Sequence, residues 1–453
     1  MWNARGLLSL ALLLSLFIPR QVAATQQIEK ETVWQGEVVL NAAVVVKREA
    51  VLTILAGTTI SPQKPEYGIT VQGTIKVLGT KKAPVKVTPV ASWKGIEMIG
   101  AGKENEFLFL EISQAKAALS SIATPFTVRH SIFRDCEVAV KLLRDAYPVI
   151  EENLFEKNGI GIDNEMKSFP VIRGNTFRGH SKNGILAAHN SGGPIEKNIF
   201  EHNTQGITLI QKYPDKVTEN RFSDNIVGIY CNQTQNSPII RDNLFEGNEN
   251  ALVNLSFAYP QVDNNRFLDN ETAIRNDQYG SPQVVRNLIR GSKMALYNNR
   301  KSNPKVEANR IENNRLIFFC DYSSYPKVRN NNFIGNRKGV ELGIYQSADW
   351  ERRSGSKSIV MEQATARRSQ NPLLAKAPTQ FEDFVDVSGN WWGEDTKKLI
   401  SAGEGGNSDL FDDRLDTPTV TYEGFGPESY VLDWVKFSPW LDKPVADVGP
   451  EKR

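Results

Sequence analysis

Four polar side chains near the middle of the chain combine the residue types that acid–base chemistry needs. Arg275 and Asp277 are two residues apart. One step of 22 residues after Arg275 stands Tyr297, and two such steps after Asp277 stands Asp321. A guanidinium, a phenol and two carboxyl groups held together could move protons and stabilise charge on a bound sugar. Solvated strand residues have the same composition, so these four are candidates for catalysis and define no reaction alone.

Aromatic residues that directly precede a proline form a second set of candidates. They are Tyr147, Phe169, Tyr213, Tyr259 and Tyr325. Rings in a line down one side of a molecule could stack on sugar rings. Tyr213, Tyr259 and Tyr325 are therefore the predicted ligand-binding residues. In the alternative interpretation, these rings cover the edge of the fold and pack on the next proline.

Both sets depend on a repeat of 22 or 23 residues. Its most regular position is an asparagine, at Asn153, Asn175, Asn198, Asn220, Asn243, Asn265, Asn287, Asn309 and Asn331. A Phe or Ile always follows two residues later, and an Ile or Val always precedes it by three. A second polar position, mostly Asn, follows five residues later. A period of this length predicts a solenoid.

The spacing inside one repeat predicts three short strands and three bends. Coils of this kind stack at the ~4.8 Å spacing of neighbouring strands. We expect the Phe position to form a buried ladder, and the Asn side chains to bond the coils above and below. The asparagine itself is expected to adopt the left-handed bend. A leucine-rich repeat is disfavoured, because no Leu-rich helical segment follows the I-x-x-N-x-F phrase.

The two ends of the chain carry further motifs. LTILAGTTI, ITVQGTIKVLGTKKAPVKVTPV and SWKGIEMI lie towards the N-terminus, and GNWWGEDTKKLI, FDDRLD and VKFSPWLDKP lie towards the C-terminus. With the repeats, they resemble the right-handed parallel β-helix proteins of the pectin-lyase-like class, including NosD-type periplasmic proteins. The resemblance implies an all-β, single-stranded right-handed parallel β-helix with coils of about 22 residues. It makes Asn390 and Trp392 the last N-x-F equivalent.

The same resemblance implies where a ligand would bind. Enzymes of the class act on acidic polysaccharides in a groove over one parallel sheet, here the sheet that follows each Gly-Ile step. Its predicted outward residues include Asp163, Thr208, Tyr230, Asn232, Asn299 and Phe319 beside the four acid–base candidates. No catalytic motif of the class maps onto this chain residue by residue.

The N-terminus predicts export. Arg5 is followed by an apolar run at 6–18 and by small residues up to Ala24. This pattern is typical of a secretory signal peptide, and the run is too short to span a bilayer. Removing residues 1–24 leaves 52 basic residues (54 less Arg5 and Arg20) against 52 acidic ones. We expect a periplasmic, cell-surface or extracellular monomer that binds no nucleic acid and keeps no transmembrane segment.

Cysteine and metal chemistry are predicted to be absent. Cys231 and Cys320 share a position in the repeat but lie four coils apart, ~19 Å at the usual strand spacing, which is too far for a disulfide. Cys136 occupies another position, so all three should be free, buried thiols. The segment DLFDDRLD is acidic but lacks the spacing of a calcium loop. We therefore predict no cofactor, with calcium as the one candidate, and the four histidines provide no copper site.

The repeat also sets the domain organisation. Five segments are predicted: a signal peptide at 1–24, N-terminal coils with a cap at 25–130, regular repeats at 131–345, an excursion at 346–380, and C-terminal coils with a cap at 381–453. The excursion is expected to be a solvated loop or a docking arm.

Two classes of function remain open. The regular inward positions and the lack of a dominant acidic cluster favour an exported, non-catalytic protein that binds a glycan or envelope component or acts as a scaffold. The alternative is a polysaccharide lyase, hydrolase or epimerase that acts in the groove over the parallel sheet.

Overall fold

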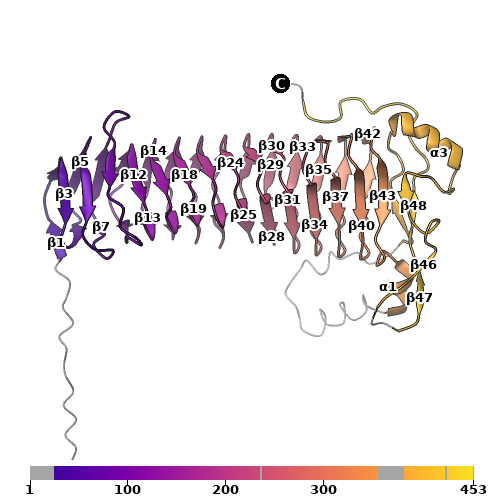
Figure 1. Ribbon diagram of the computed structural model, residues 1–453, viewed down its shortest axis with the longest axis horizontal. Coiled ribbons are helices and arrows are strands. Elements are labelled where there is room, and N and C mark those ends of the chain that lie inside the picture. The colour runs from indigo at the N-terminus through magenta and orange to yellow at the C-terminus, as the bar shows by residue number, and fades with distance from the viewer. Residues whose placement is uncertain (1–24, 235–236, 355–381, 424–425, 452–453) are drawn as a thin grey trace, which may run out of the picture.

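The protein is a long solenoid built from three parallel sheets, which we call A, B and C (Figure 1). The structure is a computed structural model that describes residues 25–234, 237–354, 382–423 and 426–451. The predicted signal peptide lies outside the described residues, as does most of the predicted excursion. No helix among the described residues has the length and apolar character needed to cross a membrane.

Each coil contributes one strand to each sheet. Sheet A contains β1 (Thr25–Ile28), β4 (Ala43–Val46), β7 (Ile69–Val71), β10 (Ile96–Ile99), β13 (Ala117–Ile122), β16 (Val138–Leu143), β19 (Ile160–Asn164), β22 (Asn183–Ala187), β25 (Gln205–Ile210), β28 (Val227–Asn232), β31 (Asn250–Leu255), β34 (Thr272–Asp277), β37 (Met294–Asn298), β40 (Leu316–Cys320), β43 (Lys338–Leu342) and β45 (Phe411–Asp412). Sheet B contains β2 (Thr32–Trp34), β5 (Val51–Leu55), β8 (Thr74–Leu78), β11 (Asn105–Leu108), β14 (Phe126–Arg129), β17 (Val149–Glu151), β20 (Val171–Arg173), β23 (Ile195–Glu196), β26 (Lys216–Thr218), β29 (Ile239–Arg241), β32 (Gln261–Asp263), β35 (Gln283–Val285), β38 (Lys305–Glu307) and β41 (Lys327–Arg329). Sheet C contains β3 (Glu37–Leu40), β6 (Thr59–Pro62), β9 (Val85–Val87), β12 (Leu110–Ser113), β15 (Ile132–Arg134), β18 (Leu154–Glu156), β21 (Thr176–Arg178), β24 (Ile199–Glu201), β27 (Arg221–Ser223), β30 (Leu244–Glu246), β33 (Arg266–Leu268), β36 (Leu288–Arg290), β39 (Arg310–Glu312) and β42 (Asn332–Ile334).

Smaller elements cover the C-terminal end of the solenoid (Figure 1). They are α1 (Ala348–Ser354), β44 (Phe384–Asp386), the 3-10 turn η2 (Gly393–Asp395), α3 (Thr396–Ala402), β46 (Thr419–Thr421), β47 (Ser429–Val431) and β48 (Trp434–Lys436). Strands β44 and β48 pair in parallel, and β46 and β47 form an antiparallel hairpin. The predicted excursion therefore begins with a helix, and residues 355–381 lie outside the described part.

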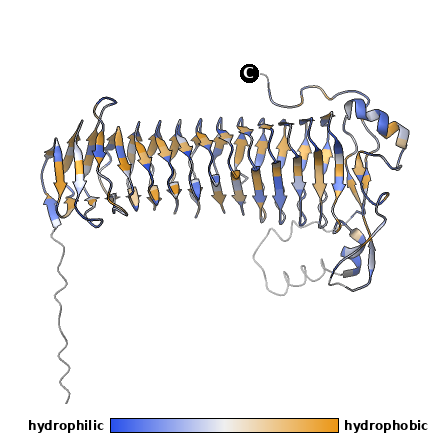
Figure 2. Cartoon of the chain, in the orientation of Figure 1, coloured by the Kyte–Doolittle hydropathy of each residue, from blue (hydrophilic) through white to orange (hydrophobic). Residues whose placement is uncertain are grey.

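The predicted Phe ladder is confirmed. The rings from Phe133 to Phe267 stack with centroids 4.7–5.2 Å apart in six consecutive steps. All of them are fully buried. Strands of this length carry hydrophilic and hydrophobic residues in alternation, which Figure 2 shows as mixed colours along single strands. The inward residues of the three sheets thus form one continuous core.

The Asn ladder is also confirmed. In a typical step, Asn175 Oδ1 accepts hydrogen bonds from both the backbone N–H and the side-chain Nδ2 of Asn153, at 2.9 and 3.0 Å. Asn175 Nδ2 donates to Ile150 O at 2.8 Å. The ladder ends as predicted, because Asn390 Oδ1 accepts from Asn331 in the same way. Each buried amide is thereby satisfied by the next coil.

One detail of the predicted bend is wrong. The left-handed residue is the one before each Asn, such as Glu152 (φ 56°), Lys197 (φ 55°) and Ala308 (φ 55°), and not the Asn itself. The Asn side chain must point inward to bond the adjacent coils. The hydrogen bonds from this Asn to the coils on either side then hold the preceding residue at a positive φ, even where that residue is not glycine.

The three cysteines are free and buried. The register of sheet A places Cys231 beside Leu209 and Asn254, and Cys320 beside Asn298, in the same inward column four coils apart. Burial raises the pKa of the Cys136 thiol to about 11 and those of Cys231 and Cys320 to about 12.

Candidate functional site

The outer face of sheet A brings the predicted acid–base candidates together. Arg275 pairs with Tyr297 in the register of β34 and β37, and Tyr297 pairs with Phe319 of β40. The Arg275 guanidinium lies 4.6 Å from the centre of the Tyr297 ring, which stacks on Phe319 at 5.1 Å. Because this row of side chains stacks along the solenoid, one face of each neighbouring ring is already covered.

Asp277 anchors an arginine from the next coil. Its carboxylate is 3% exposed and accepts two hydrogen bonds from Arg300, 2.6 Å from Nε and 2.5 Å from Nη2. The backbone N–H of Gln278 donates a third, at 2.8 Å. Bidentate, charge-assisted hydrogen bonds of this kind are among the strongest in proteins. The geometry of Asp277 is that of a structural ion pair.

Asp321 has a different environment. Its Oδ1 accepts from the backbone N–H groups of Tyr322 and Tyr345, both at 2.9 Å, and no cation among the described residues forms an ion pair with it. Burial raises the pKa of this carboxyl to about 6. The group can therefore exchange a proton near neutral pH, which is the property that a general acid or base needs.

Tyr297 lies within the electrostatic reach of both carboxylates. Burial raises the pKa of its phenol, Asp277 and Asp321 act in the same direction, and Arg275 opposes them. Asn299, from the same coil, donates its Nδ2 to the Tyr297 hydroxyl at 3.0 Å. The four candidates thus lie near one another on sheet A, on the face where the sequence predicted them. Asp277, however, already forms an ion pair with Arg300.

The predicted line of ligand-binding tyrosines requires correction. Tyr213 is 1% exposed, and its hydroxyl donates to Gly193 O at 2.5 Å, so it is part of the core. The Tyr325 hydroxyl donates to Asp433 at 2.9 Å and fastens the C-terminal elements. Tyr259 is half-buried. Packing covers the ring of Tyr213, and a hydrogen bond to Asp433 holds Tyr325, whereas Tyr147 at the same position of the repeat is 53% exposed.

A different row of aromatic side chains lies at the corner that follows sheet A. Phe257 stacks on Tyr279 at 4.7 Å, and Tyr322 stacks on Tyr345 at 4.3 Å. Tyr345 continues the row to Tyr422 of the C-terminal cap at 4.7 Å. These residues were not among the sequence candidates. The 22-residue step from Phe257 to Tyr279 was the signal in the sequence that could have identified this row. The stacking of the two rings also requires corners in which two consecutive residues have a positive φ, and the repeat alone does not predict such corners.

A shallow groove of about 400 Å³ follows the other edge of sheet A. Its floor includes Met294 and Leu316, and a column of basic residues, Lys293, Arg315 and Arg337, rises from three successive coils. Lys293 pairs with Glu271 at 2.7 Å. Arg315 and Arg337 are exposed and have no acidic partner among the residues that the structure describes. We call this surface, with the Arg275–Tyr297–Phe319 row beside it, the basic groove.

The outer faces of sheets B and C differ in their charge pairing. On sheet C, Arg134 pairs with Glu156 at 2.9 Å and Arg178 with Glu201 at 3.0 Å. On sheet B, Arg129 and Arg173 both bind Glu151. Opposite charges in successive coils neutralise one another at these positions, whereas Lys305 and Lys327 are exposed neighbours on sheet B that form no ion pair with a described acid.

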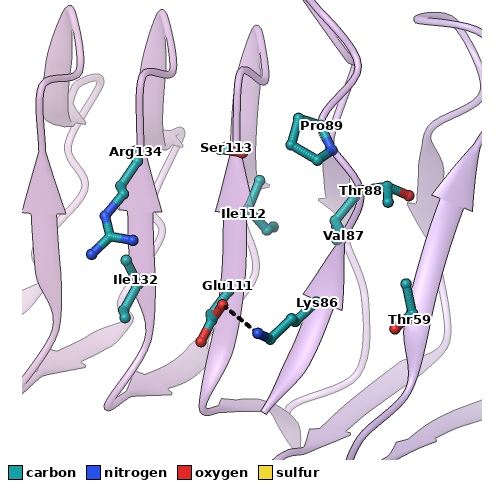
Figure 3. A pocket seen from close by; sticks show the side chains of 10 residues that line it. All are labelled: Thr59, Lys86, Val87, Thr88, Pro89, Glu111, Ile112, Ser113, Ile132 and Arg134. Atoms are coloured by element: carbon teal, nitrogen blue, oxygen red, sulfur yellow. Dashed lines mark ion pairs between the residues drawn. The ribbon is translucent and has the colours of Figure 1, made fainter.

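A second depression of about 250 Å³ lies on sheet C near the N-terminus (Figure 3). Lys86 and Glu111 point towards each other across its floor and pair at 3.4 Å. Ile132, Thr88 and Pro89 are among its other lining residues, while Ile112 and Val87 are nearly buried beneath it. This depression contains a satisfied ion pair and apolar side chains, and it defines no chemistry.

The acidic segment considered for calcium is engaged in packing. Asp413 accepts from the backbone N–H groups of Leu415 and Val435, at 2.7 and 2.6 Å. Asp412 pairs with Lys338 at 2.6 Å, and Asp416 binds Asn407 at 3.0 Å. No group of three potential metal ligands occurs within the described residues. These carboxylates join the last coil to the elements that follow it.

The continuous stack of three-stranded coils, with its Phe and Asn ladders, defines a parallel β-helix protein. Comparison with protein families agrees. The chain belongs to the family described as the right-handed beta helix region, whose model matches residues 90–215, 117–267 and 215–351. The fold and the family that the sequence predicted are thereby confirmed. No curated protein matches the chain.

Solved structures with partial similarity include three proteins. A tailspike protein of the E. coli bacteriophage HK620, solved with a pentasaccharide, has 11% identity and a TM-score of 0.37, covering 70% of this chain and 71% of its own. The periplasmic alginate epimerase AlgG has 12% identity and a TM-score of 0.36, covering 68% and 78%. An alginate lyase from Paenibacillus sp. str. FPU-7 has 10% identity and a TM-score of 0.24, covering 66% and 92%.

Proposed function

We propose that this protein is an exported, non-catalytic β-helix protein that binds an acidic glycan of the cell envelope or its surroundings in the basic groove. The observation that carries the proposal is the pair of exposed arginines in successive coils, Arg315 and Arg337, without acidic partners among the described residues. Several positive side chains on sheets B and C, such as Arg134, Arg178 and Arg129, instead face acids from the next coil.

The geometry of the basic groove suits a linear ligand. Its cations recur once per coil, at the ~4.8 Å strand spacing, so a chain lying along the solenoid would meet a new positive charge at each step. The apolar floor at Met294 and Leu316 can accept the less polar faces of sugar rings. Charged hydrogen bonds to Arg315 and Arg337 would contribute ~1.5 kcal/mol each or more.

Binding rather than turnover is favoured by the state of the carboxylates. Asp277 is held by Arg300 and is nearly inaccessible. An acid–base mechanism needs a second group placed at a defined distance from Asp321, and the ion pair with Arg300 removes Asp277 from that role. Binding needs only charge and hydrogen bonds spread over several coils.

The experiment that tests this proposal compares two double variants. Arg315→Ala with Arg337→Ala should weaken the binding of an acidic oligosaccharide by roughly a hundredfold, because ~3 kcal/mol is lost. Arg178→Ala with Arg221→Ala removes the same charge from sheet C and should change binding less than threefold. Equal losses in both double variants, measured by calorimetry, would contradict a specific groove, and so would equal binding of neutral oligosaccharides.

A second function is favoured by one observation, the carboxyl of Asp321. Its raised pKa of about 6 and its single engaged oxygen leave it able to donate a proton near the Tyr297 ring. If the protein cleaves or epimerises a polysaccharide, Asp321→Asn should abolish turnover and Asp277→Asn should reduce it only through misplacement of Arg300. No turnover of acidic polysaccharides by the wild type would contradict this alternative, and turnover that survives Asp321→Asn would exclude Asp321 as its acid or base.

A further inference from the structure

The C-terminal segment 441–451, which we call the strap, runs back along the outside of the solenoid (Figure 1). It leaves the end of the last coil, where Leu441 N–H donates to Asn390 O at 3.0 Å. It then crosses earlier coils at the corner between sheets B and C, and ends near Asn264. The strap thus crosses the strands and runs from the C-terminal coils back towards the N-terminal ones.

Backbone groups of the strap form hydrogen bonds with this corner. The Asn332 side chain binds Val445 on both sides, donating from Nδ2 to Val445 O at 3.0 Å and accepting from Val445 N–H at 2.9 Å. Gly449 N–H donates to Ala308 O at 3.0 Å. Glu451 N–H donates to Asn264 Oδ1 at 2.8 Å. The corner therefore binds the strap through its backbone at separate points, and the strap turns at Ala446 and Asp447 between the first point and the second.

One strap position has a steric requirement. Gly449 has a φ of +83°, and a Cβ built on it would lie 3.2 Å from the Cβ of Arg310. A larger residue would meet both the left-handed strain and this close approach. Pro444 and Pro450 flank the contacts and reduce the conformational freedom that the free segment would lose on binding. The strap has the composition of a preorganised peptide ligand.

We propose that the corner between sheets B and C is a peptide-binding track, that the strap is its ligand in cis, and that a peptide of the strap's sequence binds the same track in trans. The contacts follow one another along the solenoid, from Asn332 to Ala308 to Asn264. They require no particular side chain except a small residue at position 449. The partner class is thus a peptide that turns as the strap does and has a glycine at the point of closest approach.

Tethering explains why the track is occupied by the strap. A segment attached by a short linker has an effective concentration in the millimolar range. Four hydrogen bonds of modest net value suffice to hold it at that concentration, whereas the same peptide free in solution would bind weakly. A peptide in trans should therefore bind only when the strap has been released.

The test uses the full-length chain with Gly449→Val, which should release the strap. A fluorescent synthetic peptide with the sequence of residues 441–451 should bind this variant at least tenfold more tightly than it binds the wild type, by fluorescence anisotropy. Adding Asn332→Ala to Gly449→Val should weaken that binding at least tenfold. Gly405→Val is the matched control, since Gly405 also has a positive φ but meets nothing within 4 Å. It should behave as the wild type.

Hydrogen exchange completes the test. The amides of Val445 and Glu451 should exchange slowly in the wild type and in Gly405→Val, and quickly in Gly449→Val, while the coils keep their protection. Fast exchange in the wild type would overturn the proposal, because the strap would not be bound. Unchanged exchange in Gly449→Val would overturn the steric requirement, and a released strap without trans binding of the peptide would overturn the track.

Discussion

At the scale of single residues, His180 is the one exception among the asparagines from Asn158 to Asn270 in the second polar ladder. Its Nδ1 accepts the backbone N–H of Asn158 at 3.0 Å, as an Asn oxygen does elsewhere. Its buried Nε2 has no hydrogen-bond partner, and burial lowers the pKa of the ring from 6.5 to about 4. The ladder is therefore continuous through this coil, but the Nε2 atom of His180 forms no hydrogen bond.

We predict that His180→Asn stabilises the protein by about 1 kcal/mol at pH 7, because its amide can bond Asn203 and a backbone carbonyl. It should also remove acid sensitivity. The folded state resists protonation of His180, so its contribution to stability is complete above pH 6.5 and is lost as pH falls towards 4. Urea unfolding at pH 7 and pH 4.5 measures both effects. His202→Asn, at an exposed corner position, is the control and should leave the pH dependence unchanged.

The thiols give a second prediction at this scale. Because burial raises the pKa values of Cys136, Cys231 and Cys320 to between about 11 and about 12, thiolate is scarce at neutral pH. We expect thiol reagents to label none of the three in the folded protein and all three after unfolding. Mass spectrometry of the non-reduced, denatured chain should then detect three free thiols. A linked Cys231–Cys320 peptide would contradict the register of sheet A.

At the scale of elements, the ladders hold each coil to the next. Phe222 of β27 stacks on Phe200 at 4.8 Å and on Phe245 at 4.7 Å. We predict that Phe222→Ala lowers the free energy of unfolding by ~3–5 kcal/mol, since it leaves a cavity in a packed row. Arg221→Ala on the same strand, at an exposed position, should cost less than about 0.5 kcal/mol. Urea denaturation measures the difference, and equal midpoints for the two variants would contradict the ladder.

The amide ladder gives a parallel prediction. Asn220 accepts from Asn198 and donates to Ile195 O and to Asn243. Asn220→Ala should cost several kcal/mol, because it leaves buried polar groups of two coils unpaired. Asn299→Ala, on the outer face of sheet A, is the comparison and should have a small effect on stability. A similarly small effect of Asn220→Ala, measured by thermal unfolding, would show that water replaces the missing amide.

At the scale of the whole molecule, Asp433 joins the C-terminal cap to the solenoid. Its carboxylate accepts from Tyr325 at 2.9 Å, from Gln346 at 3.1 Å and from the N–H of Ala348 at the start of α1 at 2.8 Å. Burial raises the pKa of this group to about 7. The buried carboxyl is thus more easily kept in its protonated form, and the cap is held by a group that titrates near neutrality.

We predict that the cap loosens as pH rises. The contribution of Asp433 to stability is complete below the unfolded pKa near 3.8 and is lost as pH rises through about 7, because between these values the folded state binds more protons than the unfolded state. The hydrogen-exchange protection of α1 and of the hairpin β46–β47, taken relative to the intrinsic base-catalysed exchange rate, should fall between about pH 5 and about pH 7. Asp433→Asn should remove this dependence, whereas Asp409→Asn should keep it. An unchanged dependence in Asp433→Asn would assign it to another group.

The sequence alone determined the coil. Nine asparagines at steps of 22 or 23 residues, each with an inward Phe or Ile two residues later, can bury their apolar faces only by stacking identical coils. That physical requirement fixed the three sheets, both ladders, the place of Asn390 at the end and the separation of Cys231 from Cys320. It also placed Arg275, Tyr297 and Asp321 on one outer face, since alternate residues of a strand point to the same side.

Only the tertiary structure decided which of those outer residues are available to a ligand. Arg300, one coil away, closes on Asp277, and the corners bury Tyr213 and direct Tyr325 to Asp433. The unpaired charges of Arg315 and Arg337 became visible only when their neighbours were in place. The repeat specifies whether each side chain points into the core or out towards solvent. Side-chain pairing between coils, and the fold-back of the strap, depend on contacts between residues far apart in the chain, and no periodicity encodes them.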